Sequence, residues 1–257
     1  MKTKTIKKIK KLKSKIKIIF ADETVVEILP NTFTEFRLYE GKTLTTKEIK
    51  DLNKFNNYEN LYDFMVKKFL IKSYTFGKAK ELIKKKNVDE EIIEKVLSRL
   101  IKNGFIDDQA YVDEILERAD YKHFGYKKII QKLWDLKISP TLINKVKYDE
   151  IRERREASNF IKMVEPKFSN LNNTQKKKKI YEALLRNGFE SDVSLELVNK
   201  IANSNYNHEI NVLKLDYAKA YAKYSKTYNG AVLRNKIECR LLRKGYKITD
   251  IRFVEGK

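Results

Sequence analysis

Leu184-Leu-Arg-Asn-Gly-Phe189 is the stretch that decides the fold, because it has the form of a helix ending and recurs along the chain. Related stretches are Leu100-Ile-Lys-Asn-Gly-Phe105 and Leu241-Leu-Arg-Lys-Gly-Tyr246. A glycine after the last helical turn adopts the left-handed conformation at low cost, and the aromatic residue after it can pack back on the apolar face. Three such endings predict an internal repeat built from helices.

The period of this repeat is measured between residues that follow a helix ending. Four such anchors, Val88, Ile138, Phe189 and Tyr246, are separated by 50 (138 − 88), 51 (189 − 138) and 57 (246 − 189) residues. This period fits a unit of three helices. Further apolar residues lie eight positions after each anchor, on one face of a short second helix; they are Val96, Val146, Leu197 and Val254.

The period divides the chain into segments. The predicted segments are a basic tail (1–17), a small β-rich region with a short helix (18–52), a connecting helix (53–72), three-helix repeats (73–121, 122–170 and 171–227) and an incomplete C-terminal repeat (228–257). Third helices are expected at 107–121, 149–164 and 209–224. Such units bury apolar surface against their neighbours, so we expect a mainly α fold whose tandem three-helix repeats form an elongated, curved array.

The basic tail has a composition of its own. Residues 1–17 contain nine lysines and no acidic residue. Ile6, Ile9, Leu12 and Ile16 are spaced roughly as one face of a helix, which favours a basic amphipathic helix. A disordered, solvated arm is the alternative. A membrane-surface segment is disfavoured because Trp and Phe anchors are missing.

The β-rich region is predicted from β-branched residues. Residues 15–20 and 24–29 alternate in part and flank a turn at 21–23, which predicts a hairpin. Residues 33–39 are expected to add a third short strand. Thr45-Thr-Lys-Glu48 has the spacing of a capping box, so a helix should begin there and run through Leu52.

The charge of the chain favours a polyanionic partner. Its 257 residues include 56 Lys and Arg against 35 Asp and Glu, a formal charge of +21. Such a field attracts nucleic acid or acidic protein surfaces. Only 11 of the basic residues are arginine, so a general compositional bias toward lysine is the alternative explanation.

The inventory of reactive side chains is small, which argues against an enzyme. His123 and His208 have no partner at metal-ligand spacing, and no glycine-rich phosphate loop is present. Asp107 and Asp108 could hold Mg²⁺, but an aspartate after a helix ending is better explained as the cap of the next helix. We therefore expect a non-catalytic binding protein without metal or cofactor.

The location of the protein is inferred from its cysteine and its hydropathy. Cys239 is the single cysteine and cannot form an internal disulfide, which is typical of a reducing compartment; it is expected to be a small core side chain. No apolar run has the length of a secretion signal core or of a membrane span. A cytoplasmic protein without membrane contact, and a monomer, is expected.

Basic clusters are the better functional candidates. The candidate basic ridge consists of Lys127, Lys128, Arg152, Arg154, Arg155, Lys176, Lys177, Lys178, Lys179, Arg186, Arg240, Arg243 and Lys244. Arg186 and Arg243 occupy equivalent places in two repeats, so they could meet phosphates or acidic residues of a repeating partner. A solvated charged face is the alternative.

Aromatic residues at helical spacing are interpreted mainly as core. They are Tyr74, Tyr111, Tyr126, Tyr181, Tyr217, Tyr221 and Trp134. Stacking on bases is less favoured, because base-stacking platforms usually come from sheets or loops.

At its glycine endings the chain resembles the RecX family, whose members are built from tandem three-helix repeats. The resemblance rests on Leu97-Ser-Arg-Leu-Ile-Lys-Asn-Gly-Phe-Ile-Asp-Asp-Gln-Ala-Tyr111, Glu182-Ala-Leu-Leu-Arg-Asn-Gly-Phe189 and Cys239-Arg-Leu-Leu-Arg-Lys-Gly-Tyr246. It extends from about residue 57 to residue 257, and the β-rich region is similar to the extension of longer members. These motifs are packing signals and identify no active residue.

The resemblance implies a regulator that binds the RecA filament in its helical groove and modulates strand exchange, ATP hydrolysis and repressor cleavage, with inhibition as the expected direction. The chain departs from the family pattern at Leu136-Lys-Ile138, which replaces a glycine ending, and in its lysine-rich start, which adds direct DNA contact to the expectations. A general, sequence-independent DNA-binding helical protein is the alternative function.

Overall fold

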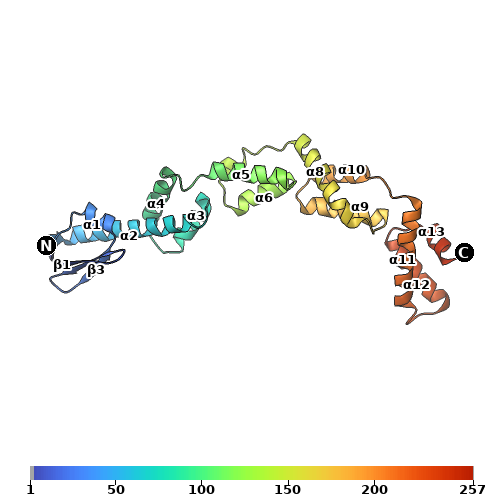
Figure 1. Ribbon diagram of the computed structural model, residues 1–257, viewed down its shortest axis with the longest axis horizontal. Coiled ribbons are helices and arrows are strands. Elements are labelled where there is room, and N and C mark those ends of the chain that lie inside the picture. Colours follow the sequence, from blue (N-terminus) through green and yellow to red (C-terminus); the bar gives the residue numbers. More distant parts are fainter. Residues whose placement is uncertain (1–2, 257) are drawn as a thin grey trace. The chain divides into compact units, whose positions relative to one another are not determined.

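The structure is a computed structural model that describes residues 3–256, most of which are helical. The strands are β1 (Thr3–Lys11), β2 (Ile16–Phe20), β3 (Val25–Ile28) and β4 (Thr43–Thr45). The helices are α1 (Pro30–Glu35), α2 (Thr46–Phe69), α3 (Phe76–Lys84), α4 (Glu90–Lys102), α5 (Asp108–Tyr121), α6 (Tyr126–Asp135), α7 (Pro140–Ile143), α8 (Glu150–Val164), α9 (Asn173–Arg186), α10 (Ser191–Asn199), α11 (Tyr206–Tyr224), α12 (Gly230–Arg243) and α13 (Ile248–Glu255). The predicted class, mainly α with a small N-terminal β-rich region, is confirmed (Figure 1).

Contacts within the chain divide it into two compact units. The N-terminal unit extends to Tyr111 and includes Leu136–Pro140, and the C-terminal unit contains Val112–Asp135 and the chain from Thr141 onward. None of the helices in the described part of the chain is both long and apolar enough to cross a membrane.

The lysine-rich start of the chain is a β-strand, which corrects the predicted helix or disordered arm. The sheet has the order β3-β2-β1-β4, so β1 pairs with a strand on each side. The register of β1 against β2 shifts between Ile6 and Lys8. Such a bulge inserts one residue, so residues three apart face the same side of the strand. Ile6 and Ile9 therefore imitate helical spacing while both pack in the core of the sheet.

The predicted hairpin is confirmed, but the third strand predicted at 33–39 is wrong. β2 and β3 pair antiparallel. Pro30 occupies the start of α1, where its fixed φ favours a helix and its missing N–H is not needed. Phe33 and Phe36 then pack on the sheet, and the fourth strand is β4, further along the chain.

The capping box at Thr45 is confirmed, whereas the predicted break after Leu52 is wrong. Thr45 and Glu48 cap α2 reciprocally, and the helix continues to Phe69 as one piece. No glycine or proline interrupts it. Asn56, which could end a helix, is buried: its side chain accepts from the backbone N–H of Leu29 (3.0 Å) and donates to the backbone oxygen of Glu27 (3.1 Å). In Figure 1 α1 and the first part of α2 lie along the sheet.

Tandem three-helix repeats follow, as predicted. The segments predicted as repeats contain α3, α4 and α5, then α6, α7 and α8, then α9, α10 and α11. The cores group these helices differently from the predicted segments, because the long helices α2, α8 and α11 each pack with the two helices that follow them. One core joins α2, α3 and α4, another joins α8, α9 and α10, and a third joins α11, α12 and α13.

Because the helices are grouped in this way, the segments predicted at the two ends of the repeats have different roles from those expected. The predicted connecting helix is the C-terminal part of α2, and it leads the first packed group through Leu61 and Met65. The predicted incomplete repeat, α12 and α13, packs with α11 through Ile237, Leu241 and Ile251. The cause is the position of the buried stripes: in α8, for example, Ala157, Phe160, Ile161 and Val164 lie in the C-terminal half, next to the helices that follow.

The four anchors follow the same backbone conformation. A residue with positive φ precedes each of them: Asn87 (49°), Lys137 (57°), Gly188 (86°) and Gly245 (90°). Ile138, Phe189 and Tyr246 are buried, and Val88 is half-buried. Gly104 (φ 73°) ends α4, a second helix, so its motif is not equivalent to those at Gly188 and Gly245.

Candidate protein and nucleic-acid interface

The helices that carry the candidate interface are positioned by three similar backbone contacts, here called repeat contacts. In each, the start of one helix packs against the turn that ends another. The first repeat contact places residues 75–77 against 136–137, the second places 125–128 against 187–188, and the third places 172–174 against 244–245. The hydroxyl of Thr75 donates to the Leu136 oxygen (2.5 Å) in the first, and the Gly125 N–H donates to the Asn187 oxygen (3.0 Å) in the second. In the third, the Asn172 amide donates to the Lys244 oxygen (3.0 Å).

Glycine is required where two backbones approach each other. A Cβ on Gly77 would overlap the backbone oxygen and Cβ of Lys137, and a Cβ on Gly125 would overlap the backbone of Gly188. Gly77 and Gly125 therefore permit the close approach of the two turns. Gly230, at the start of α12, has open space around it.

Each repeat contact is completed by a carboxylate from the following long helix. These carboxylates accept hydrogen bonds from backbone N–H groups at the start of α3, α6 and α9: Phe76 N to Asp108 Oδ1 (2.7 Å), Tyr126 N to Glu153 Oε2 (3.0 Å) and Asn173 N to Glu209 Oε1 (2.5 Å). The first N–H groups of a helix have no partner within the helix, so an incoming carboxylate satisfies one of them. Sequence reasoning missed this role, although an acid in the first turn of each long helix was a visible signal.

Burial perturbs two of these carboxyl groups. Glu153 is 1% exposed, and its second oxygen accepts from the Glu190 N–H (3.0 Å). Desolvation raises the pKa of Glu153 above its ordinary value, although the two backbone hydrogen bonds oppose the rise. Desolvation, with the neighbouring Asp107 charge, also raises the pKa of Asp108, against the hydrogen bond from Phe76.

The candidate groups for chemistry have structural partners. Asp107 Oδ1 accepts from the Ala110 N–H (2.9 Å), so the predicted capping role is confirmed. His123 Nδ1 lies 2.6 Å from the buried Glu156 carboxylate. Cys239 is exposed and contacts Asn235, so its predicted place in the core is wrong. Within residues 3–256 no group of three His, Cys, Asp or Glu side chains could hold a metal ion.

Most of the candidate basic ridge is occupied by ion pairs inside the C-terminal unit. The pairs are Lys127–Glu190, Arg152–Asp120, Arg154–Glu150, Arg154–Glu196, Arg155–Glu156, Lys176–Glu165, Lys179–Glu182 and Lys244–Asp216. Opposite charges this close lower the field that an external polyanion would meet. The hydrogen bonds from Lys200 and Arg154, for example, lower the pKa of Glu196 to about 2.

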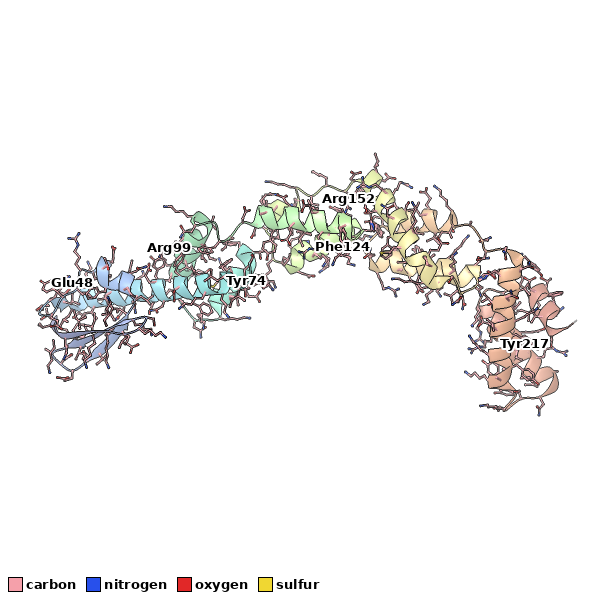
Figure 2. All side chains as sticks on the ribbon, viewed as in Figure 1. Glu48, Tyr74, Arg99, Phe124, Arg152 and Tyr217 are labelled. Carbon is pink, nitrogen blue, oxygen red and sulfur yellow. The ribbon has the colours of Figure 1, made fainter. Side chains whose placement is uncertain are left out.

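Two more members of the ridge, Lys128 and Arg240, have partial partners, and the paired Arg152 has a further one. Lys128 Nζ donates to Asn187 Oδ1 (2.6 Å) and lies 4.1 Å from the centre of the Phe124 ring, and burial lowers its pKa. The Arg152 guanidinium reaches the Phe124 backbone oxygen as well as Asp120, and the two labelled residues are neighbours in Figure 2. Arg240 lies 6.0 Å from the Tyr224 ring centre and lowers the pKa of the Tyr224 hydroxyl.

Four cations of the ridge remain available. Lys177, Lys178, Arg186 and Arg243 form no ion pair with any residue that the structure describes. Arg186 and Arg243 are exposed at the ends of α9 and α12. The available charge of the ridge therefore lies along α9 and at the end of α12.

An exposed apolar residue precedes these arginines and recurs in the repeat. Leu133, Leu184 and Leu241 are 0% exposed, and the residues directly after them, Trp134, Leu185 and Leu242, are 49%, 40% and 45% exposed. The next residue is Asp135, Arg186 or Arg243. Consecutive helical residues point in different directions, so the leucine that fills the core turns its neighbour to the solvent. Trp134 is therefore not a core residue, and neither is Tyr221, which is 50% exposed.

Comparison with known proteins gives consistent matches. The chain is similar to the regulatory protein RecX of Staphylococcus aureus strain Newman, with 24% identity over 249 residues, 95% of this chain and 90% of the relative. The relative from strain JH9 is 25% identical over 250 residues, with the same coverage. A crystal structure of a regulatory protein RecX matches with a TM-score of 0.61 and 21% identity, covering 77% of this chain and all of that one. No family model matches the chain.

Proposed function

We propose that this RecX-like chain, whose resemblance to that family is confirmed in sequence over nearly its whole length and in fold, binds the RecA–DNA filament. In this proposal it acts as a non-catalytic, monomeric regulator in the cytoplasm, and it inhibits recombinase activity. The curated relatives are named regulatory proteins, which supports a regulatory role in general.

The observation that carries the proposal is the repeated exposed position at Trp134, Leu185 and Leu242. A filament presents the same surface once per protomer, so a binding protein that repeats one contact can meet several protomers in turn. Tandem repeats create extended binding surfaces of this kind. Tryptophan and arginine are the residue types most often found at the energetic centres of interfaces, and Arg186 and Arg243 lie beside two of the three positions.

The test is cosedimentation of the full chain with RecA assembled on single-stranded DNA. Replacing Trp134, Leu185 and Leu242 together with alanine should weaken binding at least about a hundredfold, since each truncated anchor costs on the order of 1 kcal/mol or more. Inhibition of RecA-driven strand exchange by the intact chain, lost in the variant, is the functional counterpart.

A matched control uses exposed apolar residues of the same unit that do not recur. Ile151, Leu195 and Leu215 are 80%, 53% and 62% exposed. Their replacement with alanine removes similar area and should leave cosedimentation unchanged. Equal losses for the two triple variants would refute the repeated contact, and failure of the intact chain to cosediment or inhibit at any ratio would refute the function.

General DNA binding is the second candidate function. It is favoured by the net charge of +21, which attracts any phosphate backbone. If this alternative holds, the chain binds naked duplex at low salt as well as it binds a RecA filament. A gel shift with and without RecA separates the two functions.

A further inference from the structure

The outer face of the N-terminal sheet is uncovered and basic. The inner face packs on α1 and α2 through residues such as Ile6, Ile18 and Phe20. Because cross-strand partners share a face, the pairing of Lys8 with Ile19, Lys10 with Lys17 and Lys17 with Glu27 places these residues together on the other face. Lys8, Lys10 and Glu27 are exposed, and Lys17 is half-buried.

The lysines of this face lack internal partners. Lys8, Lys10 and Lys17 form no ion pair with any residue between 3 and 256, and Glu27 lies 3.4 Å from Lys15. Lys4 and Lys7, by contrast, pair with Asp22 and Glu23 in the turn between β2 and β3. The outer face therefore keeps a net positive charge after its internal pairs are counted.

The arrangement opposes the stability of the sheet. Lys10 and Lys17 are direct cross-strand partners, and like charges directly opposite each other are destabilising. A threonine at either position would remove the repulsion and has a higher strand propensity. Glu27, across from Lys17 on β3, offsets this repulsion only in part, because it also pairs with Lys15 and because neither Lys8 nor Lys10 has an acid opposite it. The uncompensated lysines point to a ligand that supplies negative charge.

Hydroxyl groups continue the same face toward β4. Thr5 pairs with Thr43 and Thr3 with Thr45, and the Thr5 and Thr43 hydroxyls lie 3.1 Å apart. Lysine ammonium groups and threonine hydroxyls are among the side chains that contact phosphate oxygens. Alternate residues on one strand face lie about 6.6 Å apart, a spacing similar to that of neighbouring phosphates along one strand of DNA, so Lys8 and Lys10 can reach adjacent phosphates.

We infer that the outer face of this sheet, built from Lys8, Lys10, Lys17 and the hydroxyls of Thr3, Thr5 and Thr43, binds the sugar-phosphate backbone of nucleic acid. The binding is independent of sequence. Aromatic stacking on bases does not contribute on this face, because Phe20, the aromatic residue within the described strands, packs in the core of the sheet. The face therefore binds duplex at least as well as single strand. Its binding does not require the repeated exposed position at Trp134, Leu185 and Leu242.

An anionic membrane fits this face less well. Stable attachment to a membrane surface needs apolar residues that enter the bilayer as well as cations. Val25, 47% exposed, and the half-buried Ile19 are the large apolar residues that the strand register places here. Neither has the size of the aromatic anchors that such surfaces use.

The test measures binding of the full chain to a short labelled duplex and to a single strand by fluorescence anisotropy, without RecA, over a series of salt concentrations. The variant carries Lys8→Thr, Lys10→Thr and Lys17→Thr. We expect affinity at low salt to fall at least about tenfold, and the slope of log affinity against log salt to decrease by about 0.9 for each lysine that contacts a phosphate. Its thermal midpoint should equal or exceed that of the unmodified chain, so the loss cannot be ascribed to unfolding.

The control removes three other unpaired, exposed lysines of the same unit, by Lys50→Gln, Lys85→Gln and Lys102→Gln. It lowers the net charge equally and should keep at least half of the affinity. Equal losses in the two variants would show that net charge alone attracts DNA and would overturn the proposal. The proposal would also be overturned if the threonine variant kept its affinity for DNA. It would be overturned too if the chain bound anionic vesicles through these lysines but did not bind DNA. Because RecA is absent, these outcomes are separate from those of the filament assay.

Discussion

The first and second repeat contacts share a backbone arrangement but differ at its tightest point. In the second, Gly188 (φ 86°) faces Gly125, so both approaching residues are glycine. In the first, Lys137 (φ 57°) occupies the left-handed position and faces Gly77. A carboxylate of the following long helix caps the incoming helix in both, Asp108 in the first and Glu153 in the second.

This difference shows which element of the contact is constrained. The incoming helix needs a glycine in both cases, because its Cβ would overlap the facing backbone. The left-handed position tolerates a side chain where space allows, as at Lys137, at the cost of strain. It does not tolerate one at Gly188, where a Cβ would overlap the backbone of Lys128. The conformation recurs even where the residue type does not.

The largest expected effect on stability comes from adding a methyl group at the tightest point of the second contact. Gly125→Ala should lower the free energy of unfolding by about 3 kcal/mol, because the new Cβ meets fixed backbone on the facing turn. Urea denaturation followed by circular dichroism measures it. Gly104→Ala is the control: Gly104 has positive φ but open space, so the change should cost only about 1 kcal/mol. Equal costs for the two variants would show that the close approach does not matter.

The next largest loss of stability should come from replacing Glu153, the buried carboxylate of the second contact. Glu153→Gln places an amide N–H near the N–H groups of Tyr126 and Glu190, so one backbone donor loses its acceptor and the variant should lose about 2 kcal/mol. Its cost should depend on pH. Because burial raises the folded-state pKa of Glu153 above 4.5, the protonated form stabilises the fold below pH 4.5, and this contribution disappears as pH rises through the folded pKa.

The difference between the native chain and Glu153→Gln should therefore be greatest below pH 4.5 and narrow above it. Urea midpoints for both proteins across this pH range measure the trend. A difference that widens with rising pH would contradict the raised pKa. NMR titration of the Glu153 carboxyl carbon gives an independent reading of the same shift.

A smaller effect, of opposite sign, is expected in the first contact. Lys137→Gly should raise the free energy of unfolding by about 1 kcal/mol, because glycine adopts positive φ without the Cβ strain. The gain is reduced by the loss of the Lys137–Glu81 ion pair (3.1 Å). Lys137→Ala, which keeps the strain and loses the ion pair, should show no gain in thermal midpoint; a gain equal to that of glycine would rule out backbone strain.

The smallest effect should come from that ion pair. Hydrogen bonding and attraction from Lys137 lower the pKa of Glu81 below 4.5. Its contribution to stability is therefore present above pH 4.5 and is lost as pH falls through the lowered pKa. Both partners are exposed, so Glu81→Gln should shift the urea midpoint only slightly at neutral pH and not at all at strongly acidic pH. An effect as large as that of Glu153→Gln would contradict the screening of an exposed pair.

The available charges could not be identified from the sequence. The candidate basic ridge was chosen by clustering along the chain, but seven of its members, including Arg152 and Lys176, pair with carboxylates of their own unit. The partners are often distant in sequence, as Asp120 is from Arg152. The lysines of β1 and β2 form a contrast, since the strand register brings Lys8, Lys10 and Lys17 together and none of them forms an ion pair with a residue that the structure describes.

The fold of the repeat region could be predicted because its signals are local. The glycine endings and the apolar spacing of α9 and α12 lie within a few residues of each other. The prediction failed where a different local structure imitates the same pattern. The bulge in β1 gave Ile6 and Ile9 a helical spacing. The predicted boundary after Leu52 was wrong, because α2 continues and its Asn56 bonds the sheet.

By itself the sequence determined the helix endings, the repeat period and the family resemblance, since the backbone preference at positions such as Gly188 and the spacing of apolar residues such as Leu184 are set by residues close together in the chain. Only the tertiary structure decided which helices share a core, which cations remain unpaired and which apolar residues face the solvent. These depend on contacts between residues far apart in the chain, and a carboxylate such as Glu153 acquires its partners, Tyr126 and Glu190, only when the helices pack.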